Sequence, residues 1–239
     1  MVRYARRTGV VVVTGALLLV GCGRADRAAP ARAEELPPPY VFDDDLPESL
    51  GADGTTITVG DSGAPVTVRV YEDPRCPVVE EFEQGDGAEV LRSRTRERRV
   101  KTEYTLASSR DDSLGGDGSK RAVNALRAAL DANLFTEYHE VLFRHRAQAE
   151  ASGGYTTKYL LELAGQVPGL RSEKFDAAVV AMSHRDFVVR SQAAYEAADA
   201  DEPRGPGTPT VVVNGQQLEG KRHDAIFDWD QFDRILAWR

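Results

Sequence analysis

Residues 71–83 read Tyr-Glu-Asp-Pro-Arg-Cys-Pro-Val-Val-Glu-Glu-Phe-Glu. The alternating residues 66–71 that lead into this segment predict a strand. Pro77 suits the first turn of a helix, where its missing N–H costs nothing. Cys76 is therefore expected at the start of a helix that directly follows a strand. In such a position the helix dipole and the free N–H groups favour a nucleophilic thiolate.

The rest of the chain predicts strands and helices in a definite order around this segment. Further strands are expected at residues 55–59, 100–106 and 210–213, with a hairpin turn at 214–215 and a return strand at 217–218. Residues 108–118 are rich in Gly, Asp and Ser and predict a loop. Apolar residues at three- or four-residue spacing predict four or five short helices between 120 and 200, and residues 229–238 predict a closing amphipathic helix.

Three separated motifs, in this order of elements, resemble the DsbA-like extracytoplasmic oxidoreductases. The first motif comprises residues 63–68 with Glu72-Asp73 and Cys76-Pro77. The second, Tyr138-His139 with Leu142-Phe143, resembles the helical insertion of that family. The third, Gly207-Thr208-Pro209-Thr210, resembles its Thr-Pro loop. The match covers residues 55–238. It implies an α/β, thioredoxin-like fold with a central mixed sheet and a helical insertion.

The resemblance also implies roles for individual residues. Cys76 is the implied catalytic nucleophile, and Pro209 is expected as a cis-proline beside its sulfur. Pro77, Thr208 and Pro209 are the implied substrate-binding residues, because the backbone of the Thr-Pro loop pairs with extended peptides in this family.

Val79 stands where the resemblance places a second cysteine. The chain has only two cysteines, so Cys76 can form a mixed disulfide but has no neighbouring sulfur to release it. Two functions remain open. One is thiol–disulfide exchange, including isomerase-like activity, through Cys76 alone, with the substrate or an external thiol completing the exchange. The other is a redox-inactive peptide-binding or scaffold module that uses the groove around Pro209.

Negative charge is concentrated around Cys76 in the sequence. The acids are Glu72, Asp73, Glu80, Glu81 and Glu83, against a single nearby cation, Arg75. Acids at the start of a helix oppose ionisation of the thiol. The sequence therefore predicts a less activated cysteine than that of a dedicated oxidant.

The first residues of the chain predict export and lipid attachment. Three arginines precede the apolar run 9–20, which has the length of a signal peptide rather than of a membrane span. Leu19-Val20-Gly21-Cys22 resembles the bacterial lipobox. We therefore expect cleavage after residue 21, acylation of Cys22 with fatty acids such as palmitate, and anchoring on the extracytoplasmic face of the cell membrane.

This leader divides the chain into three predicted parts. Residues 1–21 are the lipoprotein signal peptide, and residues 22–50 are a flexible acidic and Pro-rich tether. Residues 51–239 are the thioredoxin-like domain. Removing residues 1–21, which hold three arginines and no acids, changes the formal net charge from −8 to −11.

Composition narrows the partners and excludes several other chemistries. An acidic chain of this kind is a poor match for nucleic acid, so the expected partners are extracytoplasmic protein or peptide clients and, as one option, an external thiol donor. The four histidines lack metal-ligand spacing, so neither a metal nor another cofactor is expected. Gly60-Asp61-Ser62 resembles a serine-nucleophile loop, but no histidine precedes Ser62, and a polar turn is the simpler interpretation.

Overall fold

The computed structural model describes residues 36–199, 201–202 and 204–237. The predicted signal peptide, the lipidation site Cys22 and the tether as far as residue 35 lie outside these residues. No helix in the described ranges is both long enough and apolar enough to cross a membrane.

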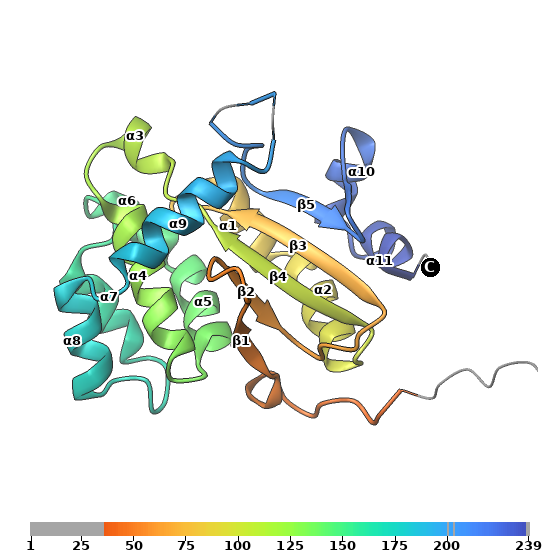
Figure 1. Ribbon diagram of the computed structural model, residues 1–239, viewed down its shortest axis with the longest axis horizontal. Coiled ribbons are helices and arrows are strands. Elements are labelled where there is room, and N and C mark those ends of the chain that lie inside the picture. The colour runs from red at the N-terminus through yellow and green to blue at the C-terminus, as the bar shows by residue number, and fades with distance from the viewer. Residues whose placement is uncertain (1–35, 200, 203, 238–239) are drawn as a thin grey trace, which may run out of the picture. The chain divides into compact units, whose positions relative to one another are not determined.

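A six-stranded mixed sheet forms the centre of the fold, in the order β1-β2-β4-β3-β5-β6 (Figure 1). β3 and β4 pair in parallel, and all the other neighbours are antiparallel. The strands are β1 (Glu48–Leu50), β2 (Thr56–Val59), β3 (Val66–Glu72), β4 (Val100–Leu106), β5 (Thr210–Val213) and β6 (Gln216–Gln217). β1 and β6, at the two edges, have three and two residues. The predicted fold class is confirmed.

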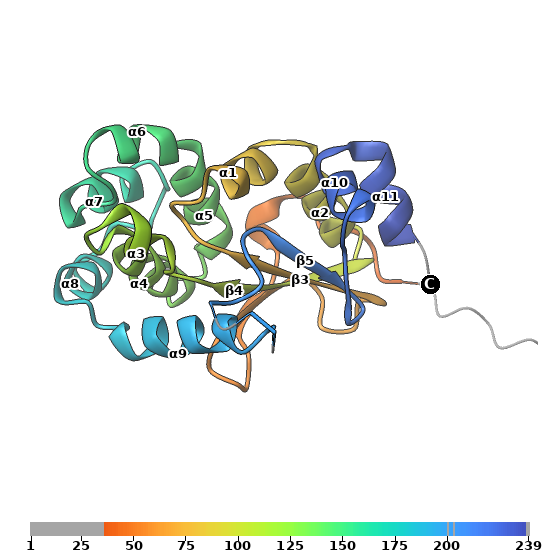
Figure 2. The same cartoon turned by 90° about the horizontal axis from the view of Figure 1, so that it is seen from above.

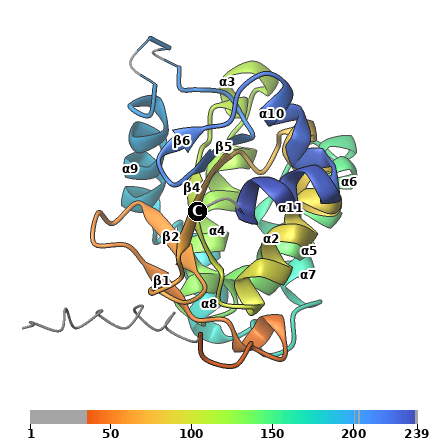
Figure 3. The same ribbon diagram turned by 90° about the vertical axis from the view of Figure 1, so that its right-hand side faces the viewer.

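Helices cover both faces of the sheet. Helices α1 (Pro77–Gln84), α2 (Asp86–Arg96) and α11 (Trp229–Ala237) lie on one face, and α9 (Arg185–Glu196) lies on the other (Figures 2 and 3). Buried valines of β3 pack with Phe82 of α1 and Phe232 of α11. Tyr71 of β3 points to the opposite face and packs with Tyr195 of α9, so the strand contributes to both layers.

The helical insertion between β4 and β5 forms a second hydrophobic core at one end of the sheet. It contains α3 (Arg110–Leu114), α4 (Gly118–Leu130), α5 (Phe135–Arg144), α6 (Arg146–Ala151), α7 (Thr157–Ala164), α8 (Glu173–Ala181) and α9. Leu126, Tyr138 and Leu160 are among its fully buried side chains. The sequence predicts four or five helices between residues 120 and 200, whereas the structure has six there (α4–α9). A further helix, α3, occupies part of the predicted loop 108–118.

The folded region begins before the predicted boundary at residue 51. Leu46 is buried in the insertion core, and β1 pairs with β2. The carboxylate of Glu48 accepts hydrogen bonds from the N–H groups of Phe135 and Thr136 at the start of α5. These contacts fix the last part of the predicted tether, because an exposed Leu46 and an unpaired start of α5 would both be unfavourable.

Candidate functional site

Cys76 lies at the junction between β3 and α1, as the sequence predicts. It is the N-cap residue of α1, with Pro77 in the first turn. Its Sγ donates a hydrogen bond to the carbonyl oxygen of Thr208 at 3.2 Å. The residue is only 5% exposed, so the sulfur is sheltered by the loop that it faces.

The loop before β5 brings Thr208 and Pro209 to this sulfur. β5 pairs with β3 so that Tyr71 lies opposite Thr210, which places the preceding loop beside the end of β3. The Thr208–Pro209 peptide bond is cis. The carbonyl oxygen of Pro209 lies 3.0 Å from His223 Nε2, on the short helix α10 (Lys221–Asp224).

The approach to the loop is open, and the start of α1 is apolar and exposed. A hollow of about 380 Å³ is lined by residues 206–210 and 217–220 with His223 and Asp224. Pro77 and Val78 are both exposed, and Val78 is a large hydrophobic residue. The structure thus brings Cys76 and Pro77 to Thr208 and Pro209, with the hollow on the other side of the loop lined by Thr208 and Pro209 but not by Cys76 or Pro77.

Val79 is fully buried beneath Cys76. The two side chains form a small apolar cluster with Phe143 of α5. Residues three positions apart share one face of a helix. The valine therefore fills the position from which a second sulfur would reach Cys76.

Arg75 fixes the segment before Cys76 to the helical insertion, a role that the sequence did not indicate. Its guanidinium pairs with Asp111 at 2.8 Å and Glu150 at 2.7 Å, and donates to the carbonyl oxygen of Gly115 at 2.9 Å. Because these contacts occupy the cation, it does not serve the thiol. Glu80 on α1 is likewise paired, with Arg146 at 2.6 Å.

Asp73 is buried under the same segment. It accepts hydrogen bonds from Ser119 Oγ at 2.6 Å and from the N–H groups of Arg110 and Arg75 at 2.9 and 3.0 Å. Burial raises the pKa of Asp73 to about 6, and the nearby Asp111 carboxylate adds to this rise, although the three hydrogen bonds oppose it. Asp73 and Glu80, two of the acids that surround Cys76 in sequence, therefore have partners of their own.

Glu72, Glu83 and His139 form a buried group between β3, α1 and α5. His139 Nε2 lies 2.5 Å from Glu72 Oε1, and His139 Nδ1 lies 3.6 Å from Glu83 Oε2. Burial raises the pKa of Glu83, and Glu72 adds to this rise, whereas His139 opposes it. Burial opposes protonation of His139, but the two carboxylates still raise its pKa.

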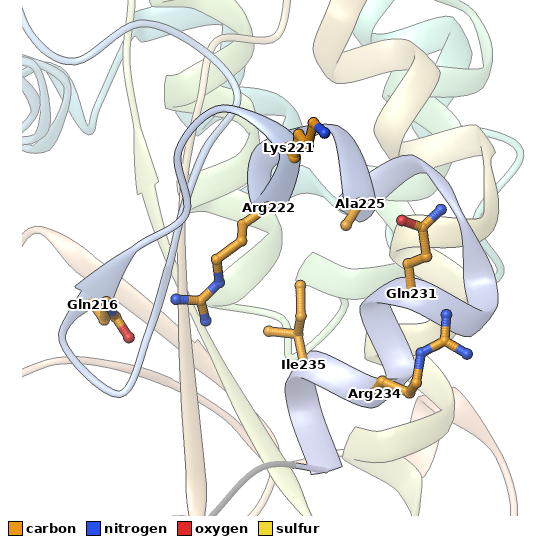
Figure 4. Close-up of a pocket in the computed structure, with 7 residues that line it drawn as sticks. All are labelled: Gln216, Lys221, Arg222, Ala225, Gln231, Arg234 and Ile235. Carbon is orange, nitrogen blue, oxygen red and sulfur yellow. The ribbon is translucent and has the colours of Figure 1, made fainter.

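A second hollow, of about 510 Å³, lies beside α10 and α11 and is lined by basic side chains (Figure 4). Arg222 and Arg234 extend along its sides, and Ile235 lies between them. None of the predicted site residues lines this hollow. It is therefore separate from the Cys76 site.

A thiol at a helix start, facing a cis-proline loop on a mixed sheet, defines a protein of thioredoxin fold with a helical insertion. A family model described as Thioredoxin matches residues 52–236. The chain belongs to this thioredoxin family. No curated protein matches it.

Several solved structures share the fold. The chain is similar to MdbA, a thiol-disulfide oxidoreductase from Corynebacterium diphtheriae, with 16% identity, a TM-score of 0.63, and coverage of 76% of this chain and 91% of that one. BdbD from Bacillus subtilis gives 20% identity, a TM-score of 0.62, and coverage of 78% and 92%. DsbA from Mycobacterium tuberculosis in its oxidised form gives 22% identity, a TM-score of 0.55, and coverage of 81% and 100%. At these identities the likeness establishes the fold, which is DsbA-like.

Proposed function

We propose that Cys76 carries out thiol–disulfide exchange as a single thiol on extracytoplasmic protein clients, from a chain tethered to the membrane through a lipid on Cys22. The observation that carries this proposal is the position of Cys76 Sγ at the N-cap of α1, 3.2 Å from the carbonyl oxygen of Thr208 beside the cis-Pro209 bond. The MdbA proteins that share the fold, which are thiol-disulfide oxidoreductases, support the same assignment.

The exchange consists of two balanced steps. The Cys76 thiolate attacks one sulfur of a client disulfide, so the Cys76–client bond forms while the client S–S bond breaks and the other client sulfur leaves as a thiolate. A client thiolate or an external thiol then attacks the client sulfur of the mixed disulfide and releases Cys76. When the client itself completes the second step, its disulfides are rearranged without net oxidation.

Access to Cys76 depends on the neighbouring loop. Because the thiol is nearly buried, an incoming disulfide must displace its hydrogen bond to Thr208. Pro77 and Val78 offer an exposed apolar surface for the client. The backbone of Thr208, once its carbonyl oxygen is released by Cys76, offers groups that pair with an extended segment. Since Val79 supplies no second thiol, each mixed disulfide persists until a thiol of the client or an external thiol attacks it.

The lipid anchor rests on the lipobox-like sequence at Cys22. Cells that produce the wild-type chain and are fed a labelled fatty acid should yield labelled protein in the membrane fraction. A Cys22→Ser variant should lose the label and be released from the membrane. Labelled Cys22→Ser protein would contradict attachment at this residue.

The redox proposal is tested by capture of mixed disulfides. Wild-type cells quenched with acid and alkylated should contain proteins disulfide-linked to Cys76, and Cys76→Ser cells should contain none. Purified wild-type protein should also reactivate a scrambled-disulfide test protein in a glutathione buffer, with Cys76→Ser as the control. If wild type forms no mixed disulfides while Cys76→Ser still binds extended peptides beside Pro209, the redox-inactive binding module replaces this proposal.

A further inference from the structure

We infer that Glu72, Glu83 and His139 bind a divalent transition-metal ion beneath the helix that carries Cys76. Glu72 is the last residue of β3, Glu83 lies near the end of α1, and His139 lies in the middle of α5. The fold thus brings one candidate ligand from each of three elements to one point. The inference does not depend on the redox activity of Cys76.

The three side chains already converge closely enough to share an ion. One ligand atom of each lies within 4.8 Å of the other two, and the Nε2–Oε1 contact of His139 and Glu72 is 2.5 Å. Bonds of 2.0–2.2 Å to zinc place neighbouring ligand atoms about 3 Å or more apart. An ion therefore requires the contact to widen by roughly half an ångström to an ångström, which small side-chain rotations can supply.

Unpaired oxygen atoms point to a missing partner. Glu72 Oε2 and Glu83 Oε1 are buried, and neither has a hydrogen-bond partner within the described part of the chain. The 3.6 Å between His139 Nδ1 and Glu83 Oε2 is too long for a hydrogen bond. A buried carboxylate oxygen without a partner is costly.

One proton leaves the three side chains with a net negative charge, whereas a divalent ion balances the two carboxylates. If His139 carries both ring protons, the two orphan oxygens remain and the group keeps one net negative charge. If Glu83 is also protonated, the three side chains are neutral, but its O–H can reach Glu72 only after a side-chain rotation, because neither unpaired oxygen has a partner as the residues lie. A divalent cation accepts electron pairs from both carboxylates and from one ring nitrogen at once.

The donor set selects the class of ion. One imidazole nitrogen and up to four carboxylate oxygens suit Zn²⁺ or a similar first-row ion such as Mn²⁺. Ca²⁺ takes six to eight oxygen ligands, which this group does not offer. The rings of Tyr104, Phe135 and Phe143 pack around the ring of His139 or against each other, with ring centroids 4.9–5.4 Å apart. This aromatic surrounding strengthens the attraction of the ligands for a cation, and the Arg92 guanidinium near Glu83 partly opposes it.

The burial of the three ligands determines the stage at which an ion can bind. All three residues are less than 5% exposed, so a folded chain offers the ligands little access from solvent. Such a site is filled as the chain folds, and the binding energy then contributes to stability. The experiment must therefore load the ion during refolding.

The test uses the full mature chain without a histidine tag, unfolded with a chelator and refolded with Zn²⁺, Mn²⁺ or Co²⁺ supplied singly. After dialysis, elemental analysis should find one ion per chain for at least one of these metals, with a higher melting temperature than the metal-free protein. Bound Co²⁺ should show visible ligand-field bands of nitrogen and oxygen ligands. Cys76→Ser should load equally, which separates this site from the thiol.

Matched variants locate the site. The affinity of Glu83→Gln for the ion should be lower than that of wild type by at least about a hundredfold. Glu81 is an exposed acid on the same helix, so Glu81→Gln should bind the ion as wild type does. Circular dichroism confirms that both variants are folded; if Glu83→Gln is not, the Co²⁺ spectrum of the wild type decides alone. Failure of the wild type to retain any of the three ions overturns the inference, as does equal retention by a folded Glu83→Gln.

Discussion

At the scale of single residues, Val79 determines what Cys76 can do. It is fully buried, and its side chain packs against Cys76 on the same face of α1. Val79→Cys should therefore convert the site into a dithiol that closes a disulfide on oxidation. With Cys22 also replaced by serine, mass spectrometry after alkylation should show two protected thiols in the oxidised variant and two alkylated thiols after reduction.

A neighbouring position provides the control for this variant. Val78 is exposed and points away from the Cys76–Val79 face. Val78→Cys should leave both thiols free for alkylation within the monomer under the same oxidising conditions. Free thiols in oxidised Val79→Cys would show that the two positions are not within reach of each other.

Replacing Arg75 should have a large effect on the stability of the fold. Its side chain and that of Asp111 are 5% and 1% exposed, so Arg75→Ala leaves a buried carboxylate without its cation. Removing one partner of a buried ion pair costs about 3–5 kcal/mol. The free energy of unfolding, measured in urea, should fall by this amount, and the rate of Cys76 alkylation should rise as the segment loosens.

An exposed ion pair provides the control for this prediction. Arg144 pairs with Glu140 on the surface of α5, with side chains about half exposed. Arg144→Ala should change the free energy of unfolding by less than about 1 kcal/mol. A similar loss in both variants would mean that burial of the Arg75 pair is not what stabilises the segment.

The sequence predicts the residues of this site that belong to local motifs and misses those that depend on the insertion. Cys76 and Pro209 each lie beside a strand or helix boundary that is visible in the sequence. Glu72 and His139 are 67 positions apart, and Arg75 and Glu150 are 75 apart. These pairs form only when α5 and α6 pack against α1, and no periodicity in the sequence reports that packing.

At the scale of elements, the turn between β1 and β2 depends on one carboxylate. Asp53 accepts hydrogen bonds from Thr55 N, Thr56 N and Thr56 Oγ1. Its small degree of burial opposes ionisation, but these hydrogen bonds dominate and lower the pKa of Asp53 to about 2. The carboxylate therefore stabilises the fold above its ordinary pKa of 3.8, and this contribution is lost as pH falls through about 2.

This linkage predicts a pH-dependent effect of Asp53→Asn. At pH 6 the variant should be less stable than wild type by about 0.5–1 kcal/mol, a figure that allows for the exposure of the group. At pH 2 the two proteins should be nearly equal in urea unfolding. Asp44→Asn, at an exposed acid in the same region, should have little effect at either pH.

Strands were easier to predict than helices for a physical reason. β4 and β5 have the predicted bounds, because both are rich in β-branched residues and β5 is a Thr/Val run between Pro209 and the turn Asn214-Gly215. α3 lies in a stretch of Gly, Asp and Ser that favours turns, and it is held by contacts from elsewhere. Its Asp111 accepts hydrogen bonds from Arg75, Ser119 N and Lys120 N.

At the scale of the whole molecule, the residues before 51 are part of the folded domain. A chain that begins at residue 51 loses the buried Leu46, the strand β1 and the contacts of Glu48 with α5. It should be less stable than a chain that begins at residue 36 by about 3 kcal/mol, from one buried leucine and one helix cap. Urea unfolding of the two chains measures the difference, and equal midpoints with equal slopes would place the boundary at 51 after all.

The short outer strands limit how copies of this protein associate when they are concentrated. Copies anchored to one membrane would lie close together, and an open sheet edge is a template on which a second copy can add a strand. With three residues in β1 and two in β6, neither end of the sheet offers a ladder long enough for such addition. The negative formal charge adds mutual repulsion between copies. Concentrated samples should therefore remain dispersed, and any covalent dimers should arise from chemistry at Cys76 rather than from fibril-like growth of the sheet.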